Sequence, residues 1–327
     1  MNFDAIRPVA NPELEQKLRK RLDSLTKPQG SLGRLEDLAL QIGLIQESEM
    51  PRVGRKAMLI FCADHGVVEE GVSPYPSAVT RQMVANFETG GAAINVLCRH
   101  AGVEPVIVDM GVGKATKNFA REAAMTRAEA ERALDIGFQY TSKAELLGVG
   151  EMGIGNTTSA AALFSAFSEI DSAETVGKGT GLDDVGVARK IDVVRRALSL
   201  HRPDAKDPVG VLAAVGGFEI AAIAGAILGA ASRKHAIVVD GFIAGAAAMV
   251  AKAMCPASLD YAIFAHCSAE KAHRKMLDVL GAKPLVDLDM RLGEGSGAAI
   301  GIMLVEASIK LYREMATFES AGVSGRE

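Results

Sequence analysis

Residues 148–167 read GVGEMGIGNTTSAAALFSAF, and the organisation of the whole chain can be worked out from this stretch. Four closely spaced glycines with Glu151 among them are followed by a polar NTTS segment and an apolar run with helical spacing. This order predicts a flexible loop that leads into a helix N-terminus, where backbone N–H groups and hydroxyls face a ligand. Such a site favours an anion, most often a phosphate.

Short, continuously apolar segments of strand length occur on both sides of this stretch. They cover residues 57–63, 103–108, 236–239, 261–265 and 285–288, and each ends in polar residues before a helical pattern begins. Continuous apolar strands alternating with helices predict an α/β fold with a parallel sheet that is covered on both faces. Ligands of such sheets lie outside the carboxyl ends of the strands. Because the polar clusters fall at those ends, the pattern favours an enzyme over a structural module.

The two ends of the chain are helical in pattern. Residues 1–50 carry leucines and isoleucines at three- and four-residue spacing, interrupted by KPQGSLG at residues 27–33. Residues 298–317 predict one long helix that follows the last strand. The 327-residue length suits one large domain with a smaller addition.

Composition excludes several classes of protein. The formal charge is −4 with no basic face interleaved with aromatics, which argues against nucleic-acid binding. The four cysteines, Cys62, Cys98, Cys255 and Cys267, are scattered without a C-x-x-C pair, so we expect a cytoplasmic protein with reduced thiols. The N-terminus is polar, so we expect no signal peptide. The apolar residues 209–231 contain Glu219 and many small residues, so they predict a buried helix hairpin broken near Gly216 rather than a membrane span.

A second anion-type loop occurs at residues 177–181, GKGTG. The P-loop pattern is absent, which argues against nucleoside-triphosphate hydrolysis. Two donor-rich loops and a nearby lysine would suit one phosphomonoester, and Lys190 is the candidate point charge. An ordinary exposed helix lysine is an equally good interpretation of Lys190 from its position.

Glu294 lies in GEGSG, residues 293–297, between a strand and a helix. A carboxylate among glycines can approach a ligand closely and act as a general base. The alternative is a surface acid near a helix N-terminus. The histidines His65, His266 and His273 lack metal-site spacing, so we predict no metal. His65 and His266 lie at strand ends, which leaves substrate contact open as an alternative to the hydrogen-bonded structural role that we expect for each.

Gly148, Gly150 and Gly153 also match the dinucleotide fingerprint, which leaves a nicotinamide-dependent oxidoreductase as an alternative function. The fingerprint also requires an acid at the end of a second strand about 20 residues later, and no apolar strand precedes the acids found there. This argues against a dinucleotide site. A non-catalytic nucleotide-binding module, with Glu294 as a surface acid, is a third possibility.

The motifs together resemble one enzyme family, nicotinate-nucleotide–dimethylbenzimidazole phosphoribosyltransferase of cobalamin lower-ligand synthesis. The resemblance extends over nearly the whole chain, in one order: residues 27–33, 63–67, 76–91, 150–158, 240–242, 266–270 and 291–295. It implies a larger Rossmann-like domain at residues 51–299 and a smaller helical domain made from residues 1–50 and about 300–327. It also implies a homodimer, no metal and no cofactor.

The resemblance implies a reaction that transfers phosphoribose from nicotinate mononucleotide to 5,6-dimethylbenzimidazole, giving α-ribazole 5′-phosphate and nicotinate. The family's catalytic glutamate corresponds to Glu294, and inversion at C1′ would explain the α-linked product. The implied nucleotide and phosphate contacts are Glu151, Gly153, Gly155, Asn156, Thr157, Gly179, Thr180, Gly181, Lys190 and Ser268. The implied benzimidazole contacts are Ser73, Tyr75, Pro76, Gln82, Met83 and Leu292.

Overall fold

A five-stranded parallel sheet forms the centre of the molecule. The computed structural model describes residues 3 and 5–324. The strand order is β2-β1-β3-β4-β5, with β1 at Lys56–Cys62, β2 at Glu104–Asp109, β3 at Leu146–Met152, β4 at Ala236–Val239 and β5 at Ala262–Phe264. The predicted α/β architecture with a Rossmann-like parallel sheet is therefore confirmed.

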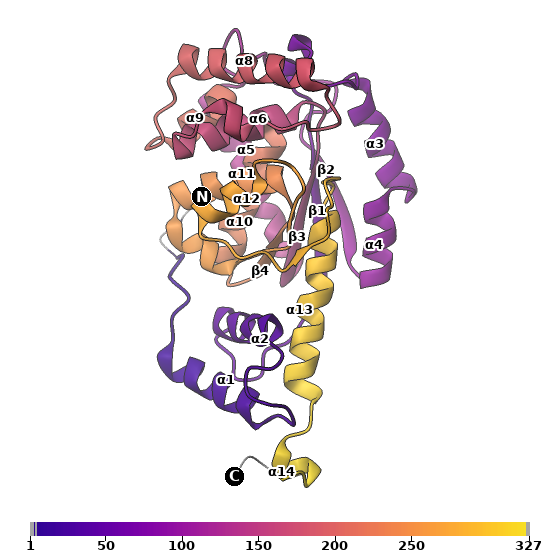
Figure 1. The fold of residues 1–327 in the computed structure, drawn as a ribbon, viewed down its shortest axis with the longest axis vertical. Coiled ribbons are helices and arrows are strands. Elements are labelled where there is room, and N and C mark those ends of the chain that lie inside the picture. The colour runs from indigo at the N-terminus through magenta and orange to yellow at the C-terminus, as the bar shows by residue number, and fades with distance from the viewer. Residues whose placement is uncertain (1–2, 4, 325–327) are drawn as a thin grey trace.

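Helices connect the strands and cover the sheet (Figure 1). Their bounds are α3 Ala78–Thr89, α4 Ala93–Ala101, α5 Arg127–Tyr140, α6 Asn156–Ser168, α7 Ser172–Thr175, α8 Asp184–His201, α9 Pro208–Val215, α10 Phe218–Ser232, α11 Phe242–Met254, α12 His273–Leu280 and α13 Ser296–Glu314. Helices α10 and α11 pack on β3 and β4 beside α5 and α6, and α13 packs on the same strands beside α4. Every residue of β3 is buried, as expected for a strand with both faces covered.

The glycine-rich start of the opening stretch differs from its prediction. Residues 148–152 are the second half of β3, and the loop is limited to residues 153–155 before α6. Gly148 and Gly150 point to the same face of the sheet, because side chains alternate along a strand. They therefore make room for packing instead of forming a phosphate loop, and the dinucleotide interpretation loses its basis.

Gly150 is the point of closest approach between β3 and the turn that precedes α13. A Cβ atom on Gly150 would lie 2.3 Å from Gly295 N and 2.5 Å from the carbonyl carbon of Glu294. On Gly148 it would meet the end of the Met58 side chain, with Met58 Cε at 2.5 Å. The absence of a side chain at Gly150 thus lets a turn from residue 294 lie directly against the third strand.

Other segments follow their predictions with local differences. The apolar residues 209–231 form the expected hairpin, α9 and α10, with a break at Gly216 and Gly217. Residues 78–101 form two helices, α3 and α4, which are separated at Gly90. The last predicted strand is only β7, Val286–Asp287, which pairs with β6, His266–Cys267, outside the main sheet. No helix formed by residues 3 and 5–324 is long and apolar enough to span a bilayer.

The two ends of the chain meet away from the sheet. In Figure 1, α13 runs from the sheet down to α1 (Pro12–Ser24), α2 (Arg34–Ile45) and α14 (Phe318–Ala321). Leu25 forms an antiparallel bridge with Thr317, and the Tyr312 hydroxyl donates to the Glu49 carbonyl at 2.8 Å. Helix α13 belongs to both regions, so the domain bounds at residues 50 and 300 stay a prediction. Residues 1, 2, 4 and 325–327 of the predicted smaller domain lie outside the described residues.

We expect Gly150→Ala to destabilise the fold more than Gly148→Ala. The methyl group at Gly150 meets rigid backbone, and overpacking of this kind costs about 1–3 kcal/mol. The methyl group at Gly148 meets a flexible methionine, and its cost is offset by the lower backbone entropy that alanine gives the unfolded chain. Urea unfolding of both variants measures the difference, and equal losses would contradict the close approach at Gly150.

Candidate active site

The carboxyl ends of the strands surround a cavity of about 490 Å³. Its wall is built by the ends of β3 and β4, the turns before α6 and α13, the loop at residues 179–180, and Tyr75. This is the place where doubly wound sheets bind their ligands. Two chemically different groups of residues meet at this cavity: acids in its wall, and lining residues that are backed by a buried lysine.

The acidic group consists of Glu151, Asp240 and Glu294, each from a different part of the chain. All three are at least 94% shielded from solvent, since their exposed fractions are 6%, 2% and 6%. Burial and the neighbouring charge of Asp240 raise the pKa of Glu294 to about 7 and that of Glu151 to about 8. Asn156, the first residue of α6, donates a short hydrogen bond to Glu151. A carboxyl that titrates near neutral pH is suited to accept a proton during a reaction.

The Glu294 turn has a strained backbone. Glu294 has φ +62°, between Gly293 at +83° and Gly295 at +86°. A left-handed conformation is unfavourable for glutamate and usually persists only where the surrounding structure enforces it. Gly295 N and Ala298 N donate to the two carboxylate oxygens of Asp240, at 3.1 and 2.9 Å.

The second group surrounds Lys190 on α8. Lys190 is fully buried, and its ammonium donates to Thr157 Oγ1 at 2.7 Å, next to Gly179. Burial lowers the pKa of Lys190 to about 8, and the carboxylate of Glu270 opposes that shift. Gly179 N donates to Glu270 Oε1 at 3.3 Å. This group combines a helix N-terminus, a hydroxyl and a lysine, which is a suitable set for a phosphate.

The cavity wall contains most of the predicted contacts. Those that line it are Tyr75, Glu151, Gly153, Asn156, Thr157, Gly179, Thr180, Ser268, Leu292 and Glu294. Ser73 reaches the rim, where its hydroxyl lies 3.2 Å from Thr180 Oγ1. The predicted contacts that lie outside the wall, all among the described residues, are Pro76, Gln82, Met83, Gly155, Gly181 and Lys190, which is buried next to Thr157 and Gly179.

The histidines divide into two kinds. His65 is buried between Ser159 and Glu219, at 3.1 and 2.6 Å, in the hydrogen-bonded structural role predicted for it. His273 Nδ1 accepts from Ser268 N at 2.8 Å. His266, by contrast, lines the cavity, with Nε2 3.9 Å from Asp240 Oδ1.

Sequence reasoning gave no role to Asp240 or Glu270, although both line the cavity. Asp240 directly follows β4, and this position at the carboxyl end of a strand is the signal that could have identified it. Glu270 has no comparable signal, because its side chain is brought to the 177–181 loop by tertiary folding. Within the part of the chain that the structure describes, no three His, Cys, Asp or Glu side chains are grouped to hold a metal ion.

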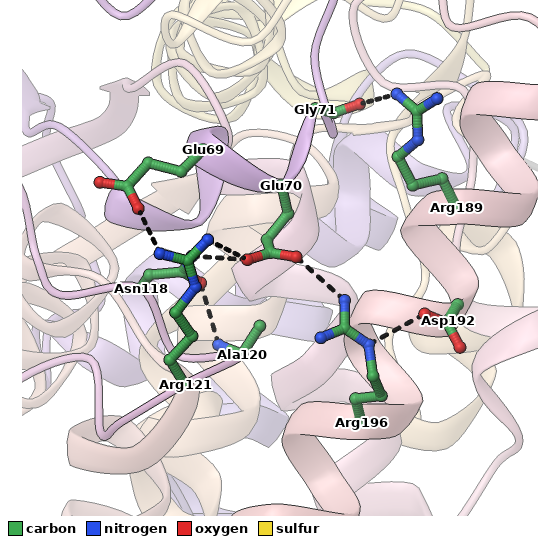
Figure 2. Close-up of polar contacts among 9 residues, drawn as sticks. All are labelled: Glu69, Glu70, Gly71, Asn118, Ala120, Arg121, Arg189, Asp192 and Arg196. Carbon is green, nitrogen blue, oxygen red and sulfur yellow. Dashed lines mark hydrogen bonds and ion pairs between the residues drawn. The ribbon is translucent and has the colours of Figure 1, made fainter.

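An ion-pair network holds α8 against the segment that leads to Tyr75 (Figure 2). Its centre is Glu70 in the short helix Gly66–Glu70, with a 14% exposed side chain. Glu70 accepts from Asn118 at 2.8 Å and pairs with Arg121 at 3.2 Å and Arg196 at 3.0 Å. Because Arg196 lies on α8 with Lys190, this network ties the helix that carries the lysine to the segment before Tyr75.

We expect Glu70→Gln to lower the free energy of unfolding by about 1–2 kcal/mol at pH 7, since it weakens charge-assisted contacts that are shielded from solvent. Hydrogen bonds from Arg196 and Asn118 lower the pKa of Glu70, so this stabilisation is present above the unfolded-state pKa and is lost as the pH falls through the folded-state pKa.

The matched control is Glu69→Gln, because Glu69 is 63% exposed and pairs with Arg121 at 3.3 Å. Its effect should be within about 0.5 kcal/mol. Urea unfolding at pH 7 and at acidic pH compares the two variants, and equal effects would contradict the central position of Glu70.

Comparison with known proteins agrees with this geometry. A family model described as Phosphoribosyltransferase matches residues 7–323. The chain belongs to this phosphoribosyltransferase family. It is therefore an enzyme that transfers a phosphoribosyl group, and the predicted resemblance is confirmed.

Individual relatives of this phosphoribosyltransferase are similar over nearly their whole length. The nicotinate-nucleotide–dimethylbenzimidazole phosphoribosyltransferase of Ralstonia nicotianae is 52% identical, over 96% of this chain and 95% of the relative. The enzyme of the same name from Chloroflexus aggregans is 48% identical, over 94% and 93%. The crystal structure of CobT from Thermus thermophilus superposes with a TM-score of 0.92 at 43% identity, covering 96% of this chain and 100% of that one.

Proposed function

We propose that this phosphoribosyltransferase moves phosphoribose from nicotinate mononucleotide to 5,6-dimethylbenzimidazole, giving α-ribazole 5′-phosphate and nicotinate for cobalamin synthesis. The observation that carries the proposal is the unequal charge of the cavity wall. Lys190 and the α6 N-terminus suit the 5′-phosphate, whereas Glu151, Asp240 and Glu294 suit the cationic pyridinium of the donor. Relatives named for these two substrates support the same assignment.

The chemistry needs one base and no acid. Nicotinate bonded through its ring nitrogen is a pyridinium, so it takes the electron pair of the C1′–N bond and leaves as a neutral ring. One nitrogen of the benzimidazole forms the new bond to C1′, while the other nitrogen loses a proton. We assign that proton to Glu294, whose pKa of about 7 suits a general base. Attack from the face opposite nicotinate inverts β to α at C1′.

The acceptor site belongs to the apolar part of the wall. Tyr75 and Leu292 line the cavity and are 50% and 54% exposed in the absence of a base. We propose that the benzimidazole lies between them, with Ser73, Pro76, Gln82 and Met83 completing the site when substrate is present. A homodimer and a cytoplasmic location complete the proposal. The family resemblance supports the homodimer, and the scattered, free cysteines support the location.

Product analysis tests the reaction. The purified protein is incubated with nicotinate mononucleotide and dimethylbenzimidazole, and the products are separated by chromatography. We expect nicotinate and an α-linked ribazole phosphate in equal amounts. Nicotinate without ribazole phosphate would point to hydrolysis or another acceptor, and the absence of nicotinate would refute the proposal.

Glu294→Gln should fold normally and reduce kcat by about 10²–10⁴-fold, the usual contribution of a general base. In the unaltered enzyme kcat/KM should fall as the pH drops below about 7, because protonation removes the base. The control is Glu314→Gln, at the exposed C-terminal end of α13, the helix that follows the Glu294 turn. This variant should be fully active. Unchanged turnover of Glu294→Gln would assign the proton to another group or to solvent.

Lys190→Met should raise KM for the mononucleotide by about 10–100-fold, as expected for the loss of one charged hydrogen bond. The effect on KM for dimethylbenzimidazole should be small, because the Lys190 ammonium bonds Thr157 and no predicted benzimidazole contact. Lys178→Met is the control, since the Lys178 side chain is 67% exposed and lies in the 177–181 loop next to Lys190. Equal effects of the two variants on KM would contradict the phosphate assignment.

A further inference from the structure

Asp240 has a geometric role that the reaction alone does not require. It directly follows β4 and is 2% exposed, yet it makes its contacts with a segment more than fifty residues later in the chain. The first turn of α13 has Gly295 as its N-cap, which offers no side-chain acceptor. Asp240 supplies the missing acceptor from outside the helix, through Gly295 N on Oδ2 and Ala298 N on Oδ1.

The same contacts bear directly on Glu294, which is the residue before Gly295. The turn is confined from three sides: Gly150 of β3 lies against its backbone, the Ser296 hydroxyl donates to Gly293 O at 2.8 Å, and Asp240 holds the N–H of Gly295. A glutamate at φ +62° needs such enforcement, because the left-handed conformation is strained for a residue with a side chain.

Resting on the proposed function, we propose that Asp240 is a positioning residue, which fixes the place of Glu294 by holding the first turn of α13. It acts through Glu294 and takes no proton from the substrate. Burial raises the pKa of Asp240, and the N–H groups that both of its oxygens accept at the helix N-terminus oppose that shift.

The charged and titratable groups around Glu294 come from several elements. They are Asp240 after β4, Glu151 in β3, His266 in β6, Arg291 in its own loop and the buried Cys62 of β1. Burial and the neighbouring charge of Asp240 raise the pKa of Glu151 to about 8. Asp240 is the neighbour whose charge raises the pKa of Glu294, after burial itself. Removing that charge should therefore make Glu294 a stronger acid.

The test compares Asp240→Asn with Ser296→Ala in the full-length enzyme. Asparagine keeps the shape and one acceptor but loses the charge, whereas Ser296→Ala removes a hydrogen bond from the same turn and leaves the charge intact. We expect Asp240→Asn to reduce kcat by about 10²-fold, the scale of a misplaced catalytic group, with KM for the mononucleotide within about 3-fold. The acid limb of its pH profile should move down by about 1 pH unit, and that of Ser296→Ala should not move.

A direct titration separates this proposal from the proposed function. The carboxyl of Glu294 is followed by carbon NMR of the glutamate-labelled protein and is assigned with Glu294→Gln. Its pKa should be about 1 unit lower in Asp240→Asn whether or not the protein transfers phosphoribose. Asp240→Ser, which is smaller and keeps one acceptor, replaces Asp240→Asn if that variant does not fold. An unchanged titration of Glu294, or an unchanged kcat in an active enzyme, would overturn the positioning role.

Discussion

The contact between Gly150 and the backbone of the Glu294 turn is the constraint on which the active site depends. It brings the N-terminus of α13 to the third strand, so that Glu151 at the end of that strand lies beneath Gly293. Asp240 then completes the turn from the neighbouring strand. Three acids from distant parts of the chain are thereby held together, and a residue with a side chain at position 150 would push them apart.

The acidic and lysine groups are held by different means. The acidic group rests on rigid parts of the fold, two adjacent strands and the start of a long helix. The lysine group depends on α8 and the 177–181 loop, which are fixed by side chains. Glu270 accepts a hydrogen bond from the loop, and the Glu70 network holds α8 through Arg196. This division suits a reaction in which the C1′ chemistry needs accurate placement of the reacting atoms, while the phosphate needs charge and donors.

The sequence predicted the fold because continuous apolar strands and intervening helices leave few other arrangements. It also pointed to Glu294 and Lys190 as candidates, since glycine loops at strand ends carry a local signal, and their roles stay predictions. It misjudged residues 148–152, because glycines in a buried strand and glycines in a loop look alike until the packing partner, here the turn before α13, is known. It missed Asp240 and Glu270, whose roles arise from contacts with segments far away in the chain.

The most direct test of the account is a crystal structure of the protein with nicotinate mononucleotide bound. The account predicts that the phosphate lies within hydrogen-bond distance of Thr157 and Gly179, beside Lys190, and that the pyridinium ring faces Glu151 and Glu294. A donor bound in the reverse direction, or outside this cavity, would contradict the division of the wall into a phosphate site and an acidic site.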